Sequence, residues 1–135
     1  PMGPLWKKLQ YWETITLPDG RKVEPSEVVD PPRPGRKIVY SGDTAPCDSV
    51  IKLSKGATLL IHESTYGNDL EDKALETKHS TTTHAARVAK EAGVEKLVLT
   101  HISSRYSNLN ELQEQAQKIF PNTKVAEDLM EIVLN

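Results

Sequence analysis

After residue 36, apolar residues follow two alternating patterns along the chain. Short aliphatic and β-branched runs predict strands, and longer segments with an apolar residue every three or four positions predict helices. The runs predicted as strands are 37–41, 58–62, 96–100, 124–126 and 131–134. The segments predicted as helices are about 46–54, 82–92 and 110–120. Strands that alternate with helices are typical of a parallel sheet in an α/β domain.

The first 36 residues have a different composition, with most of the prolines of the chain. Asp19-Gly20 separates two short extended runs, which predicts a hairpin, and the proline-rich residues 31–36 predict a stiff linker. The opening Pro1-Met-Gly-Pro-Leu-Trp6 has a loop composition, as expected of a piece cut from a longer protein. We therefore expect a loop and hairpin arm over 1–36 and an α/β domain over 37–135.

Composition and charge narrow the function classes. The 135 residues, 37% of them hydrophobic, suffice for one modest core, and the formal net charge of −2 gives no overall basic field for nucleic acid. A single cysteine, Cys47, excludes an internal disulfide and fits a cytoplasmic protein. No membrane-length apolar run or signal-peptide order occurs, so we expect a soluble protein. The glycine motifs of dinucleotide, P-loop and serine-hydrolase sites are also absent from the sequence.

Two metal-capable side chains directly follow predicted strands. Asp43 comes after Gly42 at the end of the first run, and His101 ends the run Leu97-Val-Leu-Thr. Because parallel strands present chemistry at their carboxyl ends, we expect Asp43 and His101 within a few ångströms of each other, on neighbouring strands. Hard oxygen and imidazole ligands suit divalent metals. The alternatives are a helix-capping Asp43 and a hydrogen-bonded structural His101.

The other three histidines have different settings in the sequence. His79 precedes the helix predicted from about 80–82, whose amino end attracts anions, so it is placed to contact a phosphate or give a proton to a leaving oxygen; the alternative is a solvent-exposed loop residue. His62 is followed by Glu63, which could orient an imidazole, but a plain buried strand end is the favoured interpretation. His84 lies off the apolar stripe and is expected at the surface.

Basic residues offer local phosphate contacts. Arg105, next to Tyr106, could clamp a phosphate, and an exposed loop arginine is the alternative. Lys7 and Lys8 form a second local basic pair near the start of the chain.

The ordered combination of these segments resembles the carboxyl-terminal half of ribonuclease Z, the tRNA 3′-processing endonuclease family of the metallo-β-lactamase superfamily. The combination is highly specific, whereas no single segment would be. The segments that carry the resemblance are Gly3-Pro-Leu-Trp6, Pro34-Gly-Arg-Lys-Ile-Val-Tyr-Ser-Gly-Asp-Thr44, Leu60-Ile-His-Glu-Ser-Thr65, His79-Ser-Thr-Thr82 and Leu97-Val-Leu-Thr-His-Ile-Ser-Ser-Arg-Tyr106.

The resemblance implies a fold and residue roles. The fold would be half of a metallo-β-lactamase αββα sandwich, and the cofactor two zinc ions. Asp43 resembles the carboxylate that bridges the zinc ions, His101 the last ligand of the second zinc, and His79 the histidine that assists the leaving 3′-oxygen. Arg105, Lys7 and Lys8 would contact the phosphates of precursor tRNA. Half of a sandwich would also expose apolar surface of its sheet, so we expect the chain to self-associate as a homodimer or to bind the missing half.

The chain also departs from the family pattern. The His-x-His-x-Asp-His motif, which supplies most zinc ligands in the family, is absent, as is a further histidine ligand. We therefore expect a missing amino-terminal half of the same domain as a partner. The alternatives are a catalytically silent fragment, a phosphate-binding or interaction module, and another hydrolase of the superfamily.

Overall fold

The computed structural model describes residues 4–31 and 33–134. The chain divides into two compact units, Pro1–Gly35 and Arg36–Asn135, and each has its own hydrophobic cluster. None of the helices in the described part has the length and apolar character needed to cross a bilayer.

The smaller unit contains the predicted hairpin and two short helices. Its elements in chain order are α1 (Pro4–Gln10), β1 (Ile15–Thr16), β2 (Lys22–Val23) and α2 (Pro25–Val28). β1 and β2 pair antiparallel, and Gly20 takes the positive φ of 85° that the turn requires. The loop predicted around Gly3-Pro-Leu-Trp6 is wrong from Pro4 onward, because α1 forms there and packs Leu9 with Ile15 and Val23 of the hairpin. Gly3 lies outside the described residues.

The larger unit is built on a parallel sheet of four strands, which confirms the predicted α/β class. The strands are β3 (Ile38–Tyr40), β4 (Leu59–Glu63), β5 (Lys96–Thr100) and β6 (Thr123–Val125), in the order β3-β4-β5-β6. β4 therefore lies between β3 and β5, and the expectation that the strands before Asp43 and His101 are direct neighbours is wrong. The strand predicted at 131–134 does not form, because no neighbouring strand pairs with it.

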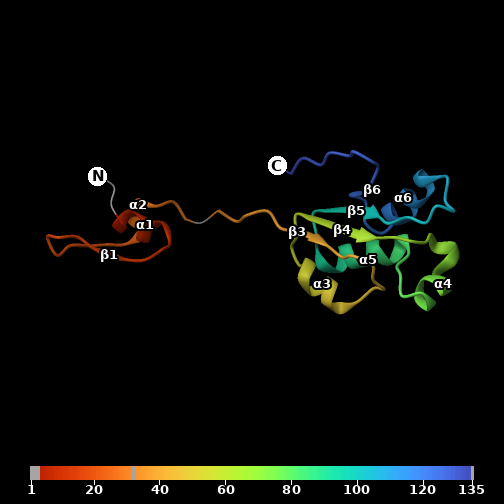
Figure 1. The fold of residues 1–135 in the computed structure, drawn as a ribbon, viewed down its shortest axis with the longest axis horizontal. Helices are drawn as coiled ribbons and strands as arrows, with labels where there is room; N and C mark the ends of the chain where they lie inside the picture. Colours follow the sequence, from red (N-terminus) through yellow and green to blue (C-terminus); the bar gives the residue numbers. More distant parts are fainter. Residues whose placement is uncertain (1–3, 32, 135) are drawn as a thin grey trace. The chain divides into compact units, whose positions relative to one another are not determined.

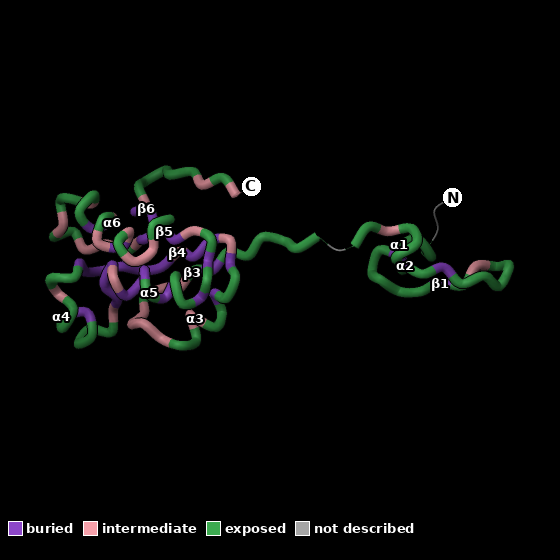
Figure 2. The backbone as a smooth tube through the Cα atoms, turned by 180° about the vertical axis from the view of Figure 1, so that it is seen from behind, coloured by how far each residue is buried: buried purple, intermediate pink, exposed green. Residues whose placement is uncertain are grey.

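Helices connect the strands and cover one face of the sheet (Figure 1). The helices of this layer are α3 (Asp48–Ser54), α5 (Thr82–Ala92) and α6 (Leu109–Gln117). The 3₁₀ turn η1 (Asn68–Leu70) and α4 (Glu71–Glu76) lie in the connection between β4 and α5. α5 packs against both α3 and α6, and its alanines meet Leu60, Leu97 and Leu99 of the sheet in the core, where the buried segments of Figure 2 gather. Large apolar side chains remain exposed on β3, where Ile38 and Tyr40 are 57% and 63% exposed.

The start of α5 fixes the residues that lead into the site. Thr81 is the N-cap: its hydroxyl accepts from the His84 amide, and the His84 ring accepts from the Thr81 amide. Gly93 ends the helix with a φ of 65°, directly after the range 82–92 predicted from the sequence. The surface position predicted for His84 is wrong. The residue is 7% exposed, because its ring folds back onto the cap and contacts Glu71 Oε1 at 3.0 Å through Nε2.

Candidate functional site

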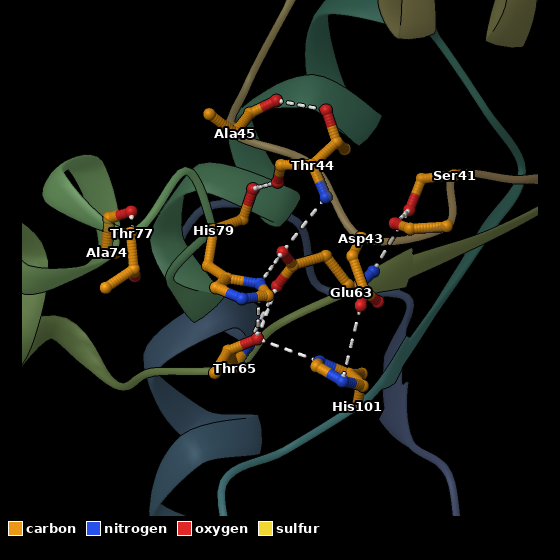
Figure 3. A network of polar contacts seen from close by, with 12 residues as sticks. Ser41, Asp43, Thr44, Ala45, Glu63, Thr65, Ala74, Thr77, His79 and His101 are labelled. Carbon is orange, nitrogen blue, oxygen red and sulfur yellow. Dashed lines mark hydrogen bonds and ion pairs between the residues drawn. The ribbon is translucent and has the colours of Figure 1, made fainter.

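Polar side chains from four segments meet at the carboxyl edge of the sheet, the edge formed by the ends of β3, β4 and β5 (Figure 3). Asp43 follows β3, Glu63 ends β4, His101 directly follows β5, and His79 comes from the loop before α5. The parallel strands start from the same side, so their ends and these side chains share one edge.

The structure brings together the three residues predicted from the sequence to act here. Asp43 Oδ2 lies 3.6 Å from His101 Nε2, and both side chains are about half exposed, at 55% and 47%. The rings of His79 and His101 are stacked, with centroids 5.5 Å apart and planes 19° from parallel. Residues 43, 79 and 101 therefore face one region although they are far apart in the chain.

Glu63 is the buried centre of this region, with a side chain only 1% exposed. Oε1 accepts from the Thr44 amide at 3.1 Å and contacts His79 Nδ1 at 2.7 Å. Oε2 accepts from both the amide and the hydroxyl of Thr65, each at 2.9 Å. Burial alone would raise the pKa of Glu63, but hydrogen bonds from Thr65, His79 and Ser80 outweigh it and hold the pKa below its ordinary value. The carboxylate is thus charged and orients the His79 ring.

The Thr65 hydroxyl lies between the acid and both histidines. Besides its bond to Glu63, Oγ1 is 3.1 Å from His79 Nδ1 and 2.9 Å from His101 Nδ1. Thr65 is 8% exposed, so these contacts are sheltered from water. One side chain therefore touches every other member of the cluster except Asp43 (Figure 3).

Backbone geometry and short loops place Asp43 and His101. Gly42 has a φ of 63°, and the Ser80 hydroxyl donates to the Thr44 carbonyl at 2.6 Å, which ties the Asp43 loop to the start of α5. His101 itself has a φ of 54°, an uncommon left-handed conformation for a residue with a side chain. Such strain at a strand end is typical of functional sites, where surrounding contacts hold it in place.

Tyr66 and Arg105 border the site on the side of His79. The Tyr66 ring meets the His79 ring edge to face at 6.2 Å, and the Arg105 guanidinium lies 5.4 Å from the centre of the Tyr66 ring. Arg105 is exposed and donates from Nε to the Ser103 hydroxyl at 3.2 Å. Lys7 and Lys8 lie on α1 of the smaller unit, where both are exposed, and their contact with a substrate stays a prediction.

His62 does not join this cluster. It is fully buried within β4, and its Nδ1 lies 2.7 Å from the Glu63 carbonyl, an acceptor, so Nδ1 carries the hydrogen. Burial lowers the pKa of His62 more than the neighbouring Glu63 groups raise it. His62 is therefore a neutral residue of the strand, as the favoured interpretation of the sequence had it.

The residues at this edge fit a metal ion between Asp43 and His101. Glu63, His79 and His101 each offer a ligand atom, all within 4.8 Å of one another, but the Thr65 hydroxyl touches all three residues and lies among them. Asp43 Oδ2 and His101 Nε2 are better placed. Two ligands of one tetrahedral zinc, each at about 2.0–2.2 Å, lie roughly 3.3 Å apart, close to the observed 3.6 Å.

Sequence reasoning missed two members of the cluster. Glu63 was considered as a partner of His62 and as a residue that could complete the site, but its contact with His79 was not foreseen, and Thr65 had no assigned role. Glu63 ends β4 and Thr65 follows two residues later, so the rule that led to Asp43 and His101 also applies to them: polar residues at the end of an apolar run lie at the carboxyl edge.

Comparison with known proteins identifies the family. Residues 26–102 match the family described as "Beta-lactamase superfamily domain". The chain is 56% identical over 106 residues to a protein named Ribonuclease Z from Myxococcus xanthus, covering 78% of this chain and 34% of the relative. It is 50% identical over 133 residues to a Ribonuclease Z from Methanosarcina acetivorans, covering 98% and 43%.

A solved structure agrees with the sequence comparison. The crystal structure of the short form of human tRNase Z superposes with a TM-score of 0.60 at 36% identity, covering 84% of this chain and 37% of that one. The chain belongs to the β-lactamase superfamily, and its resemblance to ribonuclease Z is confirmed. It spans less than half the length of these relatives.

Proposed function

We propose that this member of the β-lactamase superfamily forms part of a zinc-dependent endoribonuclease that removes the 3′ trailer of precursor tRNA. One observation carries the proposal: Asp43, His79 and His101 meet at the carboxyl edge of a chain about half identical to proteins named Ribonuclease Z. Metal-assisted hydrolysis can use a carboxylate and an imidazole as metal ligands beside an acid for the leaving group, and this edge offers one of each.

Asp43 and His101 would hold zinc, with Asp43 bridging two ions in the complete enzyme. Their donor atoms have the separation that a shared ion requires, and both face solvent, so a metal and a substrate can reach them. Bound zinc would lower the pKa of a coordinated water and stabilise charge on the phosphoryl oxygens.

His79 would protonate the leaving 3′-oxygen. Glu63 holds Nδ1 at 2.7 Å, so Nε2 is the nitrogen left for the substrate. In its imidazolium form His79 gives the Nε2 proton to the oxygen of the departing strand, and the buried Glu63 carboxylate keeps the ring in that orientation. The half-buried position of the ring beside Tyr66 restricts its rotation.

An amino-terminal part of the same domain would complete the site. A catalytic zinc usually has three protein ligands, whereas Asp43 and His101 are two. The exposed Ile38 and Tyr40 on β3 are apolar surface that such a partner could cover. We propose further that the complete protein is a cytoplasmic homodimer and that Arg105, Lys7 and Lys8 contact substrate phosphates.

Reconstitution tests the proposal. The 135-residue chain is assayed on precursor tRNA with zinc, alone and with an added amino-terminal part that carries the histidine-rich motif. We expect no cleavage by the chain alone and cleavage at the 3′ end of the mature tRNA sequence by the mixture. Cleavage by the chain alone would contradict the two-part site. A mixture that binds zinc but cleaves no tRNA would contradict the proposal that precursor tRNA is the substrate.

A further inference from the structure

The Thr65 hydroxyl contacts three hydrogen-bonding groups but has only one hydrogen to donate. This hydroxyl has one hydrogen and two lone pairs, and it contacts Glu63 Oε2, His79 Nδ1 and His101 Nδ1. Glu63 is ionised and can only accept, so the single hydrogen of Thr65 points to Oε2. Both histidine contacts are then favourable only if each Nδ1 donates.

The two histidines differ in what else holds this hydrogen. His79 Nδ1 also contacts Glu63 Oε1 at 2.7 Å, a charged acceptor that would keep the hydrogen on Nδ1 without Thr65. His101 Nδ1 has the Thr65 hydroxyl at 2.9 Å as its only hydrogen-bond partner among the described residues. The Asp43 carboxylate faces the other nitrogen, Nε2, at 3.6 Å, which is too long for a hydrogen bond. Among hydrogen bonds, the tautomer of His101 therefore depends on Thr65, whereas that of His79 does not.

We propose that Thr65 is a positioning residue that fixes neutral His101 as the Nδ1–H tautomer and so leaves its Nε2 lone pair directed towards Asp43. Neutral imidazole in water favours the opposite tautomer, with hydrogen on Nε2, which cannot bind a metal through that nitrogen. A hydrogen-bond partner on the second nitrogen is how a ligating histidine is usually oriented. The tautomer rests on hydrogen bonding alone, and its use in presenting Nε2 to zinc rests on the proposed function.

Nitrogen NMR of the metal-free chain tests the tautomer directly. Long-range proton–nitrogen spectra are recorded about two pH units above the ordinary histidine pKa of roughly 6.5. With four histidines in the chain, each ring is assigned by its substitution to Gln. We expect the His101 Nδ1 signal at the protonated position and Nε2 at the unprotonated position. A wild-type His101 with hydrogen on Nε2 would overturn the proposal.

Substitutions of Thr65 then separate positioning from packing. Thr65→Val keeps the shape and removes the hydroxyl, so His101 should shift to a mixture with hydrogen mostly on Nε2, while His79 keeps its Nδ1–H signals as the control in the same molecule. Thr65→Ser should restore the wild-type His101 signals. If His101 is unchanged in Thr65→Val, Thr65 does not fix its tautomer. Should Thr65→Val fail to fold, Thr65→Ala gives the same comparison.

Zinc titration of the chain links the tautomer to the metal. A lost hydrogen-bond partner typically weakens metal affinity by about 10–100-fold, so Thr65→Val should weaken zinc binding by that factor and Thr65→Ser should stay near wild type. Unchanged zinc affinity in Thr65→Val, with a shifted tautomer, would overturn the positioning role. Activity of the reconstituted enzyme on tRNA is a separate measurement, so the proposed function can fail or stand independently.

Discussion

The two units of the chain differ in where their polar side chains lie. In the larger unit, polar groups of Glu63, Thr65 and the start of α5 are buried and bonded to one another at the carboxyl edge of the sheet. In the smaller unit, the buried cluster is Leu9, Ile15 and Val23, and the basic residues of α1 are exposed. A buried polar network holds its members in one geometry, whereas an exposed lysine can adopt many.

This difference predicts how strongly each region responds to substitution. Removal of one member of a buried network leaves its partners unsatisfied, and removal of an exposed lysine leaves nothing unsatisfied. We therefore expect large effects at the carboxyl edge and small ones on α1. A large loss of activity or stability from a substitution on α1, or a small loss from one at the carboxyl edge, would contradict the comparison.

The largest effect is expected at the proposed metal ligands. Asp43→Ala or His101→Ala in the reconstituted enzyme should remove zinc and lower cleavage to background, at least about 10²-fold, since one lost electrostatic contact to the transition state already costs that much. Zinc content and single-turnover cleavage measure the effect. The matched control is Asp72→Ala, which removes an exposed carboxylate on α4 and should retain activity.

His79 should affect chemistry and not the metal. His79→Ala is expected to lower the cleavage rate by about 10²–10⁴-fold, the usual contribution of a general acid, while zinc content is kept. The leaving group of a nitrophenyl phosphodiester needs no proton, so its cleavage rate should fall far less. Equal losses on both substrates would contradict the role of His79 as an acid.

Acid should destabilise the larger unit in two stages. The pKa of His62 is lowered in the folded state, so the unfolded chain binds the extra proton as pH falls below 6.5 and stability is lost there. Glu63 has a lowered pKa too, so its contribution is present above 4.5 and is lost as pH falls below that value towards its folded pKa.

Urea unfolding of the 135-residue chain across this pH range measures both stages. Each proton contributes a slope of at most about 1.4 kcal/mol per pH unit. His62→Gln should remove the slope just below pH 6.5 and leave the second stage, and Glu63→Gln should do the reverse. A single slope that neither variant changes would show that other groups control acid unfolding.

The sequence predicted those parts of the fold that depend on local pattern. Strands β3 to β6 and the limits of α5 follow from apolar runs and capping residues, and the convergence of Asp43 and His101 follows from the parallel sheet. The order of the strands did not follow from these local patterns: β4 lies between the strands that lead to Asp43 and His101, because each new strand is added beside the previous one.

Features that depend on long-range contacts were not predictable. The 2.7 Å contact between Glu63 and His79 joins residues 16 positions apart, and only the folded loop before α5 brings them together. Helix α1 depends on packing of Leu9 against the hairpin, and residues 131–134 have an apolar strand pattern without a pairing strand. His84 looked exposed by periodicity, but capping overrides periodicity in the first turn.

His84 provides an intermediate effect on stability. His84→Ala removes a capping contact and the partner of Glu71, so we expect a loss of about 1 kcal/mol in the free energy of unfolding. Zinc content and cleavage should be nearly unchanged, since the ring does not contact the cluster of Glu63, Thr65 and the two stacked histidines. Arg87→Ala, exposed on the same helix, should change stability by less than about 0.5 kcal/mol.

The smallest effect is expected from the lysines of α1. Lys7→Ala and Lys8→Ala should leave the free energy of unfolding within about 0.5 kcal/mol of wild type, because both side chains are exposed. If each contacts one phosphate, each substitution should raise the KM for precursor tRNA and reduce the slope of log affinity against log salt by about one. Lys22→Ala, also exposed in the smaller unit, is the matched control. Slopes that are equal in all three variants and wild type would remove α1 from the tRNA contact surface, whereas a loss of the cleavage rate itself would place a lysine at the reacting phosphate.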